Sequence, residues 1–336
     1  MKYSIFILFL CLFHSFVWAQ DYHTSNIQNI SQLHNPAVIG LRNDMEAGVS
    51  YRTQWRSVGS PFTAIGASFY STTDPDHRKQ DGHLTLGLNA YREQMSRTGS
   101  ATSVTMNVAQ HIALTKRSTL SLGMNFGVYA RSINEENGMW ESQHNGLFYD
   151  QNLASGEVFE STQRVRFDIG SGMVYSFRTR QQKPLVRAGF AAYHLNQPDI
   201  SYTSSVVSVL PIRSVLFTSF VLPLGKKSPY SLEGTLLYQN QRKFHSFMIG
   251  GMVKAKLVEK VKTTSANAKL SSWDAGIGMY IRGKDAFIIN AQLERSEWKA
   301  SLAYDMTFST LKNHSKGAVE FQLSYTIPKY VRELLY

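Results

Sequence analysis

The sequence predicts an all-β fold, a single transmembrane outer-membrane β-barrel of about 14 antiparallel strands. Three observations predict it. Apolar and polar residues alternate in repeated blocks between Met45 and Ile327, an apolar segment at the N-terminus has the form of an export signal, and aromatic residues make up 12% of the chain. Because successive side chains of a strand point to opposite faces, each block has one apolar and one polar face, as a wall between lipid and an aqueous lumen requires.

The first element, residues 1–19, is expected to be a cleaved signal peptide. Lys2 supplies a positive start, an apolar run follows, and Val17-Trp18-Ala19 forms a small-residue cleavage site. A membrane anchor is the alternative, but the apolar run is short and lacks a basic flank. Cleavage would remove Cys11, the only cysteine, and leave a mature chain without disulfides or cysteine-based metal sites.

Residues 20–44 are polar and non-periodic, and we expect an N-terminal non-barrel segment there. Two placements are open, against the periplasmic rim or inside the lumen as a plug. Residues 45–327 are expected to form the barrel, and residues 328–336 a C-terminal tail. The predicted strands are 45–56, 61–71, 83–93, 101–114, 118–131, 167–177, 184–194, 213–222, 230–239, 244–257, 271–282, 285–294, 298–308 and 317–327.

An even strand number lets a bacterial barrel close with both ends of its sheet on the periplasmic side. If the N-terminus is periplasmic, the long connections 132–166 and 195–212 face outward. Connections of that length are often functional. The connections 72–82 and 259–270 are then periplasmic and unusually long, which suggests contact with periplasmic machinery.

Seven charged residues fall on the predicted lumen faces: Arg52, Glu233, Asp274, Arg282, Glu294, Asp305 and Glu320. They either line a water-filled pore or form a network that binds the N-terminal segment or an inserted partner. Arg52 and Glu320 are expected at similar height on the first and last strands. We therefore predict that they interact across the closing strands, either directly or through the N-terminal segment near Asn35-Pro36, against the alternative that lumen water solvates each charge separately.

Catalytic and metal-binding patterns are not supported by the sequence. His111, His194 and Ser171 have no spacing that brings a nucleophile, a base and an orienting group together. The ten histidines are scattered, and we expect no metal site and no cofactor. The net charge of +11, or +10 without Lys2, is spread along the chain, so anionic lipid or an acidic protein is a better partner than nucleic acid.

Several motifs occur in a fixed order along the chain. Asn35-Pro36-Ala37 with Gly40 is followed by Tyr51-Arg52-Thr53-Gln54-Trp55 and by Pro61-Phe62-Thr63. Phe167-Asp168 and His194-Leu195-Asn196-Gln197-Pro198 follow in the middle of the chain. The end contains Ala303-Tyr304-Asp305, then Ser309, then Gly317-Ala318-Val319-Glu320. Each motif alone would indicate only a turn, an aromatic residue at the membrane interface or a residue that faces the lumen.

Together these motifs resemble the PorP/SprF family of outer-membrane proteins tied to type IX secretion in Bacteroidota. One departure is Ala318-Val319, where the family more often has Ser-His. The candidate motif, lumen and partner residues are Asn35, Pro36, Gly40, Tyr51, Arg52, Gln54, Trp55, Pro61, Thr63, Asp168, Asn196, Pro198, Tyr304, Asp305, Ser309, Gly317 and Glu320.

The resemblance implies a non-enzymatic barrel that serves secretion, surface display and gliding motility. Its implied partner is a large secreted surface protein, an adhesin, recognised through a C-terminal sorting domain and held at the outer membrane. An assembly role, in which the barrel docks lipoproteins of the periplasmic ring, is the alternative. A passive porin is the third hypothesis. Outer-membrane lipid is expected as the surrounding partner in each case.

Overall fold

The computed structural model describes residues 21, 23–28, 31–41, 45–57, 60–73, 82–150, 152–178, 184–204, 207–225, 228–258, 272–309 and 317–327. The predicted signal peptide, the C-terminal tail, the connection 259–270 and most of the connection 72–82 lie outside these residues. Among the described residues, no helix has the length and apolar character needed to cross a membrane.

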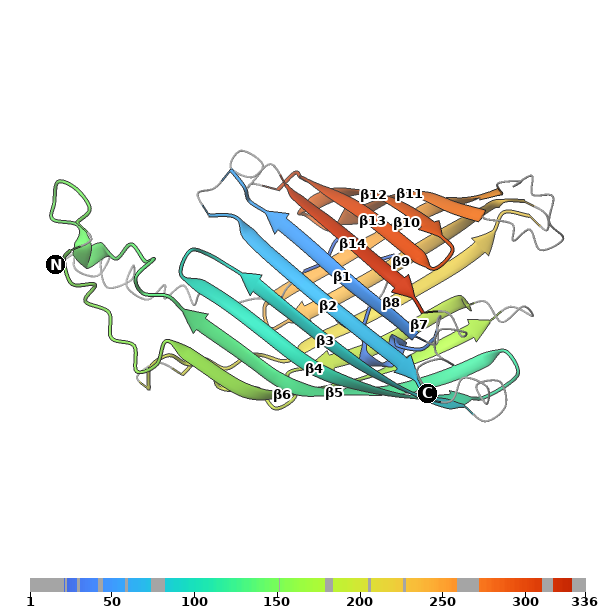
Figure 1. The fold of residues 1–336 in the computed structure, drawn as a ribbon, viewed down its shortest axis with the longest axis horizontal. Helices are drawn as coiled ribbons and strands as arrows, with labels where there is room; N and C mark the ends of the chain where they lie inside the picture. The colour runs from blue at the N-terminus through green and yellow to red at the C-terminus, as the bar shows by residue number, and fades with distance from the viewer. Residues whose placement is uncertain are drawn as a thin grey trace, which may run out of the picture.

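Fourteen antiparallel strands form a closed barrel (Figure 1), which confirms the predicted fold class. The strands are β1 (Met45–Gln54), β2 (Phe62–Thr72), β3 (His83–Gln94), β4 (Gly99–Ala113), β5 (Ser118–Ile133), β6 (Gln163–Arg178), β7 (Pro184–Tyr193), β8 (Arg213–Pro223), β9 (Tyr230–Gln241), β10 (Phe244–Val258), β11 (Ser272–Arg282), β12 (Ala286–Arg295), β13 (Trp298–Thr307) and β14 (Ala318–Thr326).

Each strand pairs with its neighbour in sequence, and β1 pairs with β14 to close the barrel. The register of this closing seam runs from Glu46 opposite Thr326 to Gln54 opposite Ala318. Closure leaves no open sheet edge, so the backbone donors and acceptors of the wall bond to one another rather than facing lipid. We call the rim where odd-numbered strands end the distal rim, and the rim where β1 begins the proximal rim.

Most strands begin or end one or two residues away from the predicted bounds, and two places show why. The β5–β6 hairpin is longer than expected, because Ser132 pairs with Gln163 beyond the predicted ends. In contrast, β1 ends at Gln54 and not at residue 56. Trp55 adopts a left-handed backbone with φ of 58°, which ends the extended strand. Its ring packs edge-on against Phe62, with ring centroids 4.6 Å apart, so it closes the β1–β2 turn.

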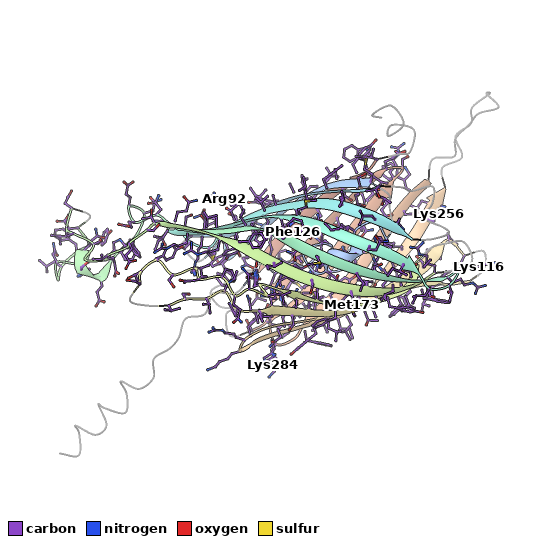
Figure 2. All side chains as sticks on the ribbon, turned by 90° about the horizontal axis from the view of Figure 1, so that it is seen from below. Arg92, Lys116, Phe126, Met173, Lys256 and Lys284 are labelled. Carbon is purple, nitrogen blue, oxygen red and sulfur yellow. The ribbon has the colours of Figure 1, made fainter. Side chains whose placement is uncertain are left out.

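The two faces of the wall follow the sequence alternation. On β5, Leu122 and Phe126 are exposed on the outside of the barrel, whereas Ser121 and Asn125 are buried inside. Figure 2 shows Phe126 and Met173 in the middle of the outer wall. The labelled basic residues lie toward its two ends: Lys116 and Lys256 at one, Arg92 and Lys284 at the other. An apolar belt between charged rims is the surface that a bilayer requires.

The N-terminal segment lies inside the lumen, which decides between the two placements that the sequence left open. Residues 24–28 and 34–41 are buried, and they include one short 3-10 helix, η1 (Pro36–Val38). Asp21, the first described residue, contacts residues of the distal rim, whereas β1 begins at the proximal rim. The segment therefore crosses the lumen from distal to proximal. We call residues 21–41 the plug.

Candidate functional site

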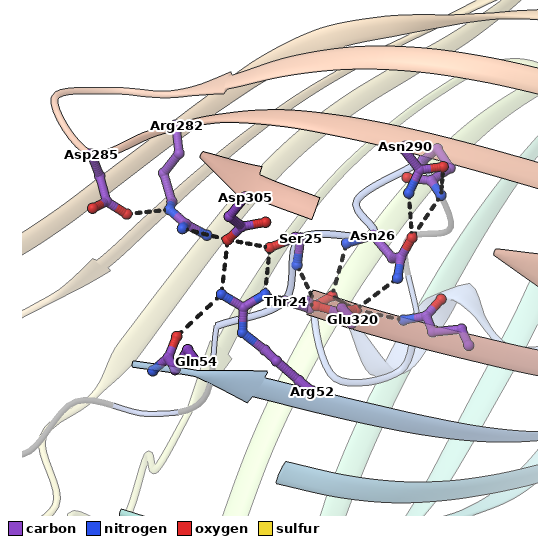
Figure 3. A network of polar contacts seen from close by, with 12 residues as sticks. Thr24, Ser25, Asn26, Arg52, Gln54, Arg282, Asp285, Asn290, Asp305 and Glu320 are labelled. Atoms are coloured by element: carbon purple, nitrogen blue, oxygen red, sulfur yellow. Dashed lines mark hydrogen bonds and ion pairs between the residues drawn. The ribbon is translucent and has the colours of Figure 1, made fainter. Parts of the chain in front are cut away.

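The plug and the lumen wall are joined by a buried network of charges at the closing seam (Figure 3). Arg52 of β1 lies between two carboxylates: its Nη1 is 3.2 Å from Glu320 Oε2, and its Nη2 is 2.9 Å from Asp305 Oδ2. Arg282 of β11 reaches the same Asp305 oxygen at 2.7 Å. Two guanidinium groups and two carboxylates thus neutralise one another, which offsets the cost of burying each charge.

Backbone and side-chain donors of the plug complete this seam network. The Thr24 hydroxyl and the Ser25 backbone N–H donate to the two carboxylate oxygens of Glu320, each at 2.6 Å. The Ser25 hydroxyl donates to Asp305 at 2.8 Å and accepts from Arg52 at 2.5 Å. Glu320 is fully buried. Its charge is therefore satisfied by the plug as well as by the wall, and charge-assisted hydrogen bonds of this kind are the strong ones.

A second charged cluster holds the start of the plug at the distal rim. Asp21 Oδ2 lies 2.7 Å from His194 Nε2 and 3.1 Å from Arg213 Nε. The other ring nitrogen of His194 is 2.9 Å from Asp168 Oδ1. The Asp21 backbone N–H donates to the Gln241 side chain at 3.1 Å. Three wall or rim residues, His194, Arg213 and Gln241, therefore contact the first described residue of the plug, and Asp168 contacts the far side of the His194 ring.

The electrostatics of this distal cluster favour its charged form. Burial alone would lower the pKa of His194, but the adjacent Asp21 and Asp168 carboxylates raise it to about 9. Burial likewise opposes ionisation of Asp21, yet His194 and Arg213 hold the pKa of that carboxyl well below its usual range. At neutral pH the cluster is therefore a buried ion pair that links the plug to the wall.

The middle of the plug is fixed by the Asn-Pro motif. The Asn35 side chain accepts from the Ala37 N–H at 2.9 Å and so caps η1. Its amide donates to the backbone oxygens of Met173 and Phe190, at 3.1 and 2.9 Å. Gly123 on β5 and Gly172 on β6 leave room for the motif, because neither carries a Cβ there. A Cβ added at Gly123 would lie 2.4 Å from the Ala37 nitrogen.

Apolar residues of the plug pack into the wall as well. Ile27, Val38 and Leu41 belong to one buried cluster with wall residues such as Phe217 and Tyr280. Beside them a cavity of about 130 Å³ remains between the plug and strands β1, β2, β13 and β14. The described part of the N-terminal segment thus lies inside the lumen and packs against its wall.

The structure brings only part of the candidate residues together. Arg52, Gln54, Asp305 and Glu320 meet in the seam network, where the predicted contact between Arg52 and Glu320 is present. Asn35 and Pro36 form the middle of the plug. Asp168 belongs to the distal cluster. Their role toward a partner stays a prediction.

The remaining candidates have local roles. The Asn196 side chain bonds the backbone of Phe167 and Ile169 on β6, and the Pro198 oxygen accepts from the Leu210 N–H at 2.9 Å. Tyr51 and Tyr304 are exposed on the outer face. Gly40 and Gly317 have positive φ. Pro61 is exposed, Thr63 pairs opposite Thr53, and the Ser309 N–H lies 3.3 Å from the Asp285 oxygen.

Sequence reasoning missed the plug's own contributors, namely Asp21, Thr24, Ser25 and Asn26, and the rim partner Arg213. It named His194 but assigned it no partner. One signal was present: Asp305 and Glu320 are carboxylates on inward faces, and buried carboxylates need donors. The polar residues of the segment supply such donors, but without periodicity nothing assigned them to particular carboxylates.

The comparison with known protein families agrees with the resemblance that the motifs indicate. The family model described as "Type IX secretion system membrane protein PorP/SprF" matches residues 17–325, which includes the plug and all fourteen strands apart from one terminal residue. No curated protein matches the chain.

Several solved structures resemble the chain at low identity. The toluene transporter TbuX of Ralstonia pickettii is 11% identical, with a TM-score of 0.47 over 87% of this chain and 92% of that chain. A FadL homologue of Pseudomonas aeruginosa is 8% identical, with a TM-score of 0.45 and the same coverage. The COG4313 outer membrane channel of Pseudomonas putida F1 is 9% identical, with a TM-score of 0.36 over 91% and 100%.

Proposed function

The chain belongs to the PorP/SprF family of type IX secretion membrane proteins, and from that premise we propose that it anchors or hands over large secreted surface proteins. Family and fold make it a component of type IX secretion in the outer membrane and indicate non-enzymatic work. The finer proposal is that the barrel receives the C-terminal sorting domain of a secreted adhesin and retains it at the cell surface, where it would serve display or gliding motility.

One observation carries the proposal: the plug lies in the lumen, and its first described residues are tied to buried charges of the wall, Asp21 to His194 and Thr24 and Ser25 to Glu320. A passive porin needs an open aqueous path. Opening one here would separate Glu320 from Thr24 and Ser25, and Asp21 from His194. Breaking a buried charged contact by removing one partner costs about 3–5 kcal/mol. A plugged barrel with long connections on one rim suits a stationary anchor.

The distal rim supplies the surface for such an anchor. The connection between β5 and β6 and the one between β7 and β8 both stand there, and they contact each other through the Glu160 N–H and the Tyr202 oxygen at 3.2 Å. Connections positioned by a rigid scaffold are common binding sites. In the orientation that the sequence predicts, this rim faces the cell exterior.

Affinity purification of the full-length protein in a gentle detergent, followed by mass spectrometry, tests the proposal. We expect a large secreted surface protein to co-purify, and to be lost when its C-terminal sorting domain is deleted. An equally tagged, unrelated outer-membrane barrel is the control. Co-purification of periplasmic ring lipoproteins alone would favour the assembly role instead.

Planar-bilayer recordings of the purified protein provide the second arm of the test. The plugged lumen predicts no steady conductance at neutral pH. A stable open channel in the wild-type protein would support the porin reading and contradict the anchor.

A further inference from the structure

The connection between β5 and β6, residues 134–162, differs in charge from the rest of the chain. We call it the distal arm. It contains no Lys or Arg and six acidic residues: Glu135, Glu136, Glu141, Asp150, Glu157 and Glu160. Its formal charge is therefore −6, and because the whole chain carries +11, the remainder carries +17. An acidic segment on a basic protein presents a local field that attracts positively charged surfaces.

The distal arm also presents apolar side chains to solvent. Leu147 is 88% exposed, Val158 82%, Met139 69% and Phe148 60%. Figure 1 shows the arm, in green, standing away from the barrel wall beyond the ends of β5 and β6. These side chains are thus separate from the outer wall whose apolar face meets lipid. Exposed apolar groups on a segment that also carries charges are typical of a protein–protein contact surface.

The tip of the arm has a defined conformation. The Asn145 side chain accepts from the N–H groups of Leu147 and Phe148, both at 3.0 Å, in a turn that contains Gly146. Below the turn, His144 and Tyr149 form an antiparallel bridge. The side chains of Leu147 and Phe148 are therefore held outward by a local turn. A presented pair of this kind binds with a smaller loss of conformational entropy than a free loop.

The base of the arm is braced by its neighbours on the distal rim. The Phe159 ring packs against Tyr202, with centroids 6.2 Å apart, and the Arg131 guanidinium lies 5.5 Å from the Tyr202 ring centre. Arg164 Nε donates to the Ser201 oxygen at 2.6 Å. The β7–β8 connection thereby supports the arm from one side. The arm is consequently a formed surface attached to a rigid barrel.

We propose that the distal arm is the docking surface for a basic face of the secreted client protein, with Leu147 and Phe148 inserted into an apolar pocket on that face. This inference rests on the proposed function, because it takes the client to be the protein that meets the distal rim. The acidic residues would steer the approach and select a basic partner, and the apolar pair would supply the central contacts.

Two sets of variants in the full-length protein separate these contributions. The first is L147S/F148S, with L224S as its matched control, because Leu224 is an exposed leucine in the β8–β9 connection at the opposite rim. The second is E141K/D150K/E157K, with Glu297→Lys in the β12–β13 turn as its control. Heat-modifiability on a gel checks that each barrel is folded.

The probe is the purified C-terminal sorting domain of the surface protein that co-purifies with the wild-type barrel. We expect L147S/F148S to weaken its binding at least tenfold, and the charge reversals to weaken it at low salt and flatten its salt dependence. The controls should bind like the wild type. Equal binding by the arm variants would overturn the docking surface while leaving the anchor function intact. If the wild type captures no surface protein, the proposed function itself fails.

A second copy of this chain is the competing occupant, since the rest of the chain is basic. Sedimentation of the purified protein in detergent tests it. A single-barrel mass for the wild type supports a client protein as the partner. Self-association that L147S/F148S abolishes would overturn the proposal in favour of arm-mediated contacts between barrels.

Discussion

Arg52 and Glu320 face each other in register across the closing seam, with Arg52 Nη1 3.2 Å from Glu320 Oε2. The pair joins the first strand to the last, and the plug residues Thr24 and Ser25 bond the same carboxylate. Glu320 therefore links the closing seam of the barrel to the plug in its lumen. A wall without its plug would leave Glu320 with fewer donors inside a confined lumen.

The first prediction concerns this pair. Arg52→Met should destabilise the barrel by about 3–5 kcal/mol, because it leaves Glu320 buried without its cation. Glu320→Gln in the same chain should restore part of the loss, with a coupling of about 0.5–3 kcal/mol. Urea unfolding in detergent micelles, read by heat-modifiability, measures both. Arg97→Met, at an exposed turn, is the control. Strictly additive losses would show that the two charges act independently.

The second prediction concerns the lipid-facing wall. Leu122 is 43% exposed on the outer face of β5, so Leu122→Arg should cost about 2–4 kcal/mol if the residue lies near the bilayer midplane. Leu114 follows β4 at the proximal end of the same hairpin, and Leu114→Arg should cost about 0–1 kcal/mol there. Folding yields into lipid vesicles compare the two variants. Equal costs would contradict the depth assignment.

The strands were predictable because each wall residue obeys a period of two, and parity alone assigns its face. The same parity placed Arg52, Asp305 and Glu320 inside the lumen. It did not locate every boundary. Trp55 continues the alternation but has a left-handed backbone, which the pattern does not reveal.

The plug was less predictable for a physical reason. A segment without regular structure has no period, so nothing in residues 20–44 indicates which side chain meets which wall residue. Ser25 and Asp305 are 280 positions apart and become neighbours only when the barrel closes. His194 and Asp21 are separated by 173 positions. Pairings of this range depend on the three-dimensional path of the segment.

The third prediction uses the close approach of the plug to β5. Gly123→Val should displace the plug, because even a Cβ there lies 2.4 Å from the backbone nitrogen of Ala37. The barrel wall itself keeps its pairing, so the expected result is a folded barrel with measurable conductance in planar bilayers. Gly99→Ala is the control, since its nearest atom is a serine oxygen at 3.4 Å. A folded Gly123→Val barrel that shows no conductance would mean that the plug shifts without opening a path through the lumen.

The fourth prediction concerns pH. In the plugged state burial lowers the pKa of His194, but the neighbouring Asp21 and Asp168 carboxylates raise it overall to about 9. The pKa falls back toward 6.5 when the plug, and Asp21 with it, leaves the lumen. A group whose pKa is raised in the plugged state contributes its full stabilisation at pH values below its pKa in the unplugged state. The attachment of Asp21 is therefore strongest below about pH 6.5. The contribution of His194 weakens as the pH rises toward about 9 and is lost above that, whereas Arg213 and Gln241 still contact Asp21.

Conductance between pH 6 and pH 10 measures this attachment. The frequency of plug openings should rise several-fold above about pH 9 in the wild type. His194→Asn cannot titrate, so its opening frequency should be high at all pH values and nearly flat. A wild-type profile as flat as that of the variant would show that the distal cluster does not hold the plug.

The fifth prediction concerns orientation. Asp21, the first described residue of the plug, lies at the distal rim, whereas β1 begins at the proximal rim. We therefore assign the periplasmic side from the start of β1 and not from the start of the plug. Leu147→Cys places a thiol at the exposed tip of the distal arm, and Leu224→Cys places one at the opposite rim. With the predicted signal peptide removed, the mature chain has no competing cysteine. On intact cells, a membrane-impermeant maleimide should label Leu147→Cys and should label Leu224→Cys only after the outer membrane is permeabilised. The reverse pattern would place the distal arm in the periplasm, and the arm could then contact only partners on that side.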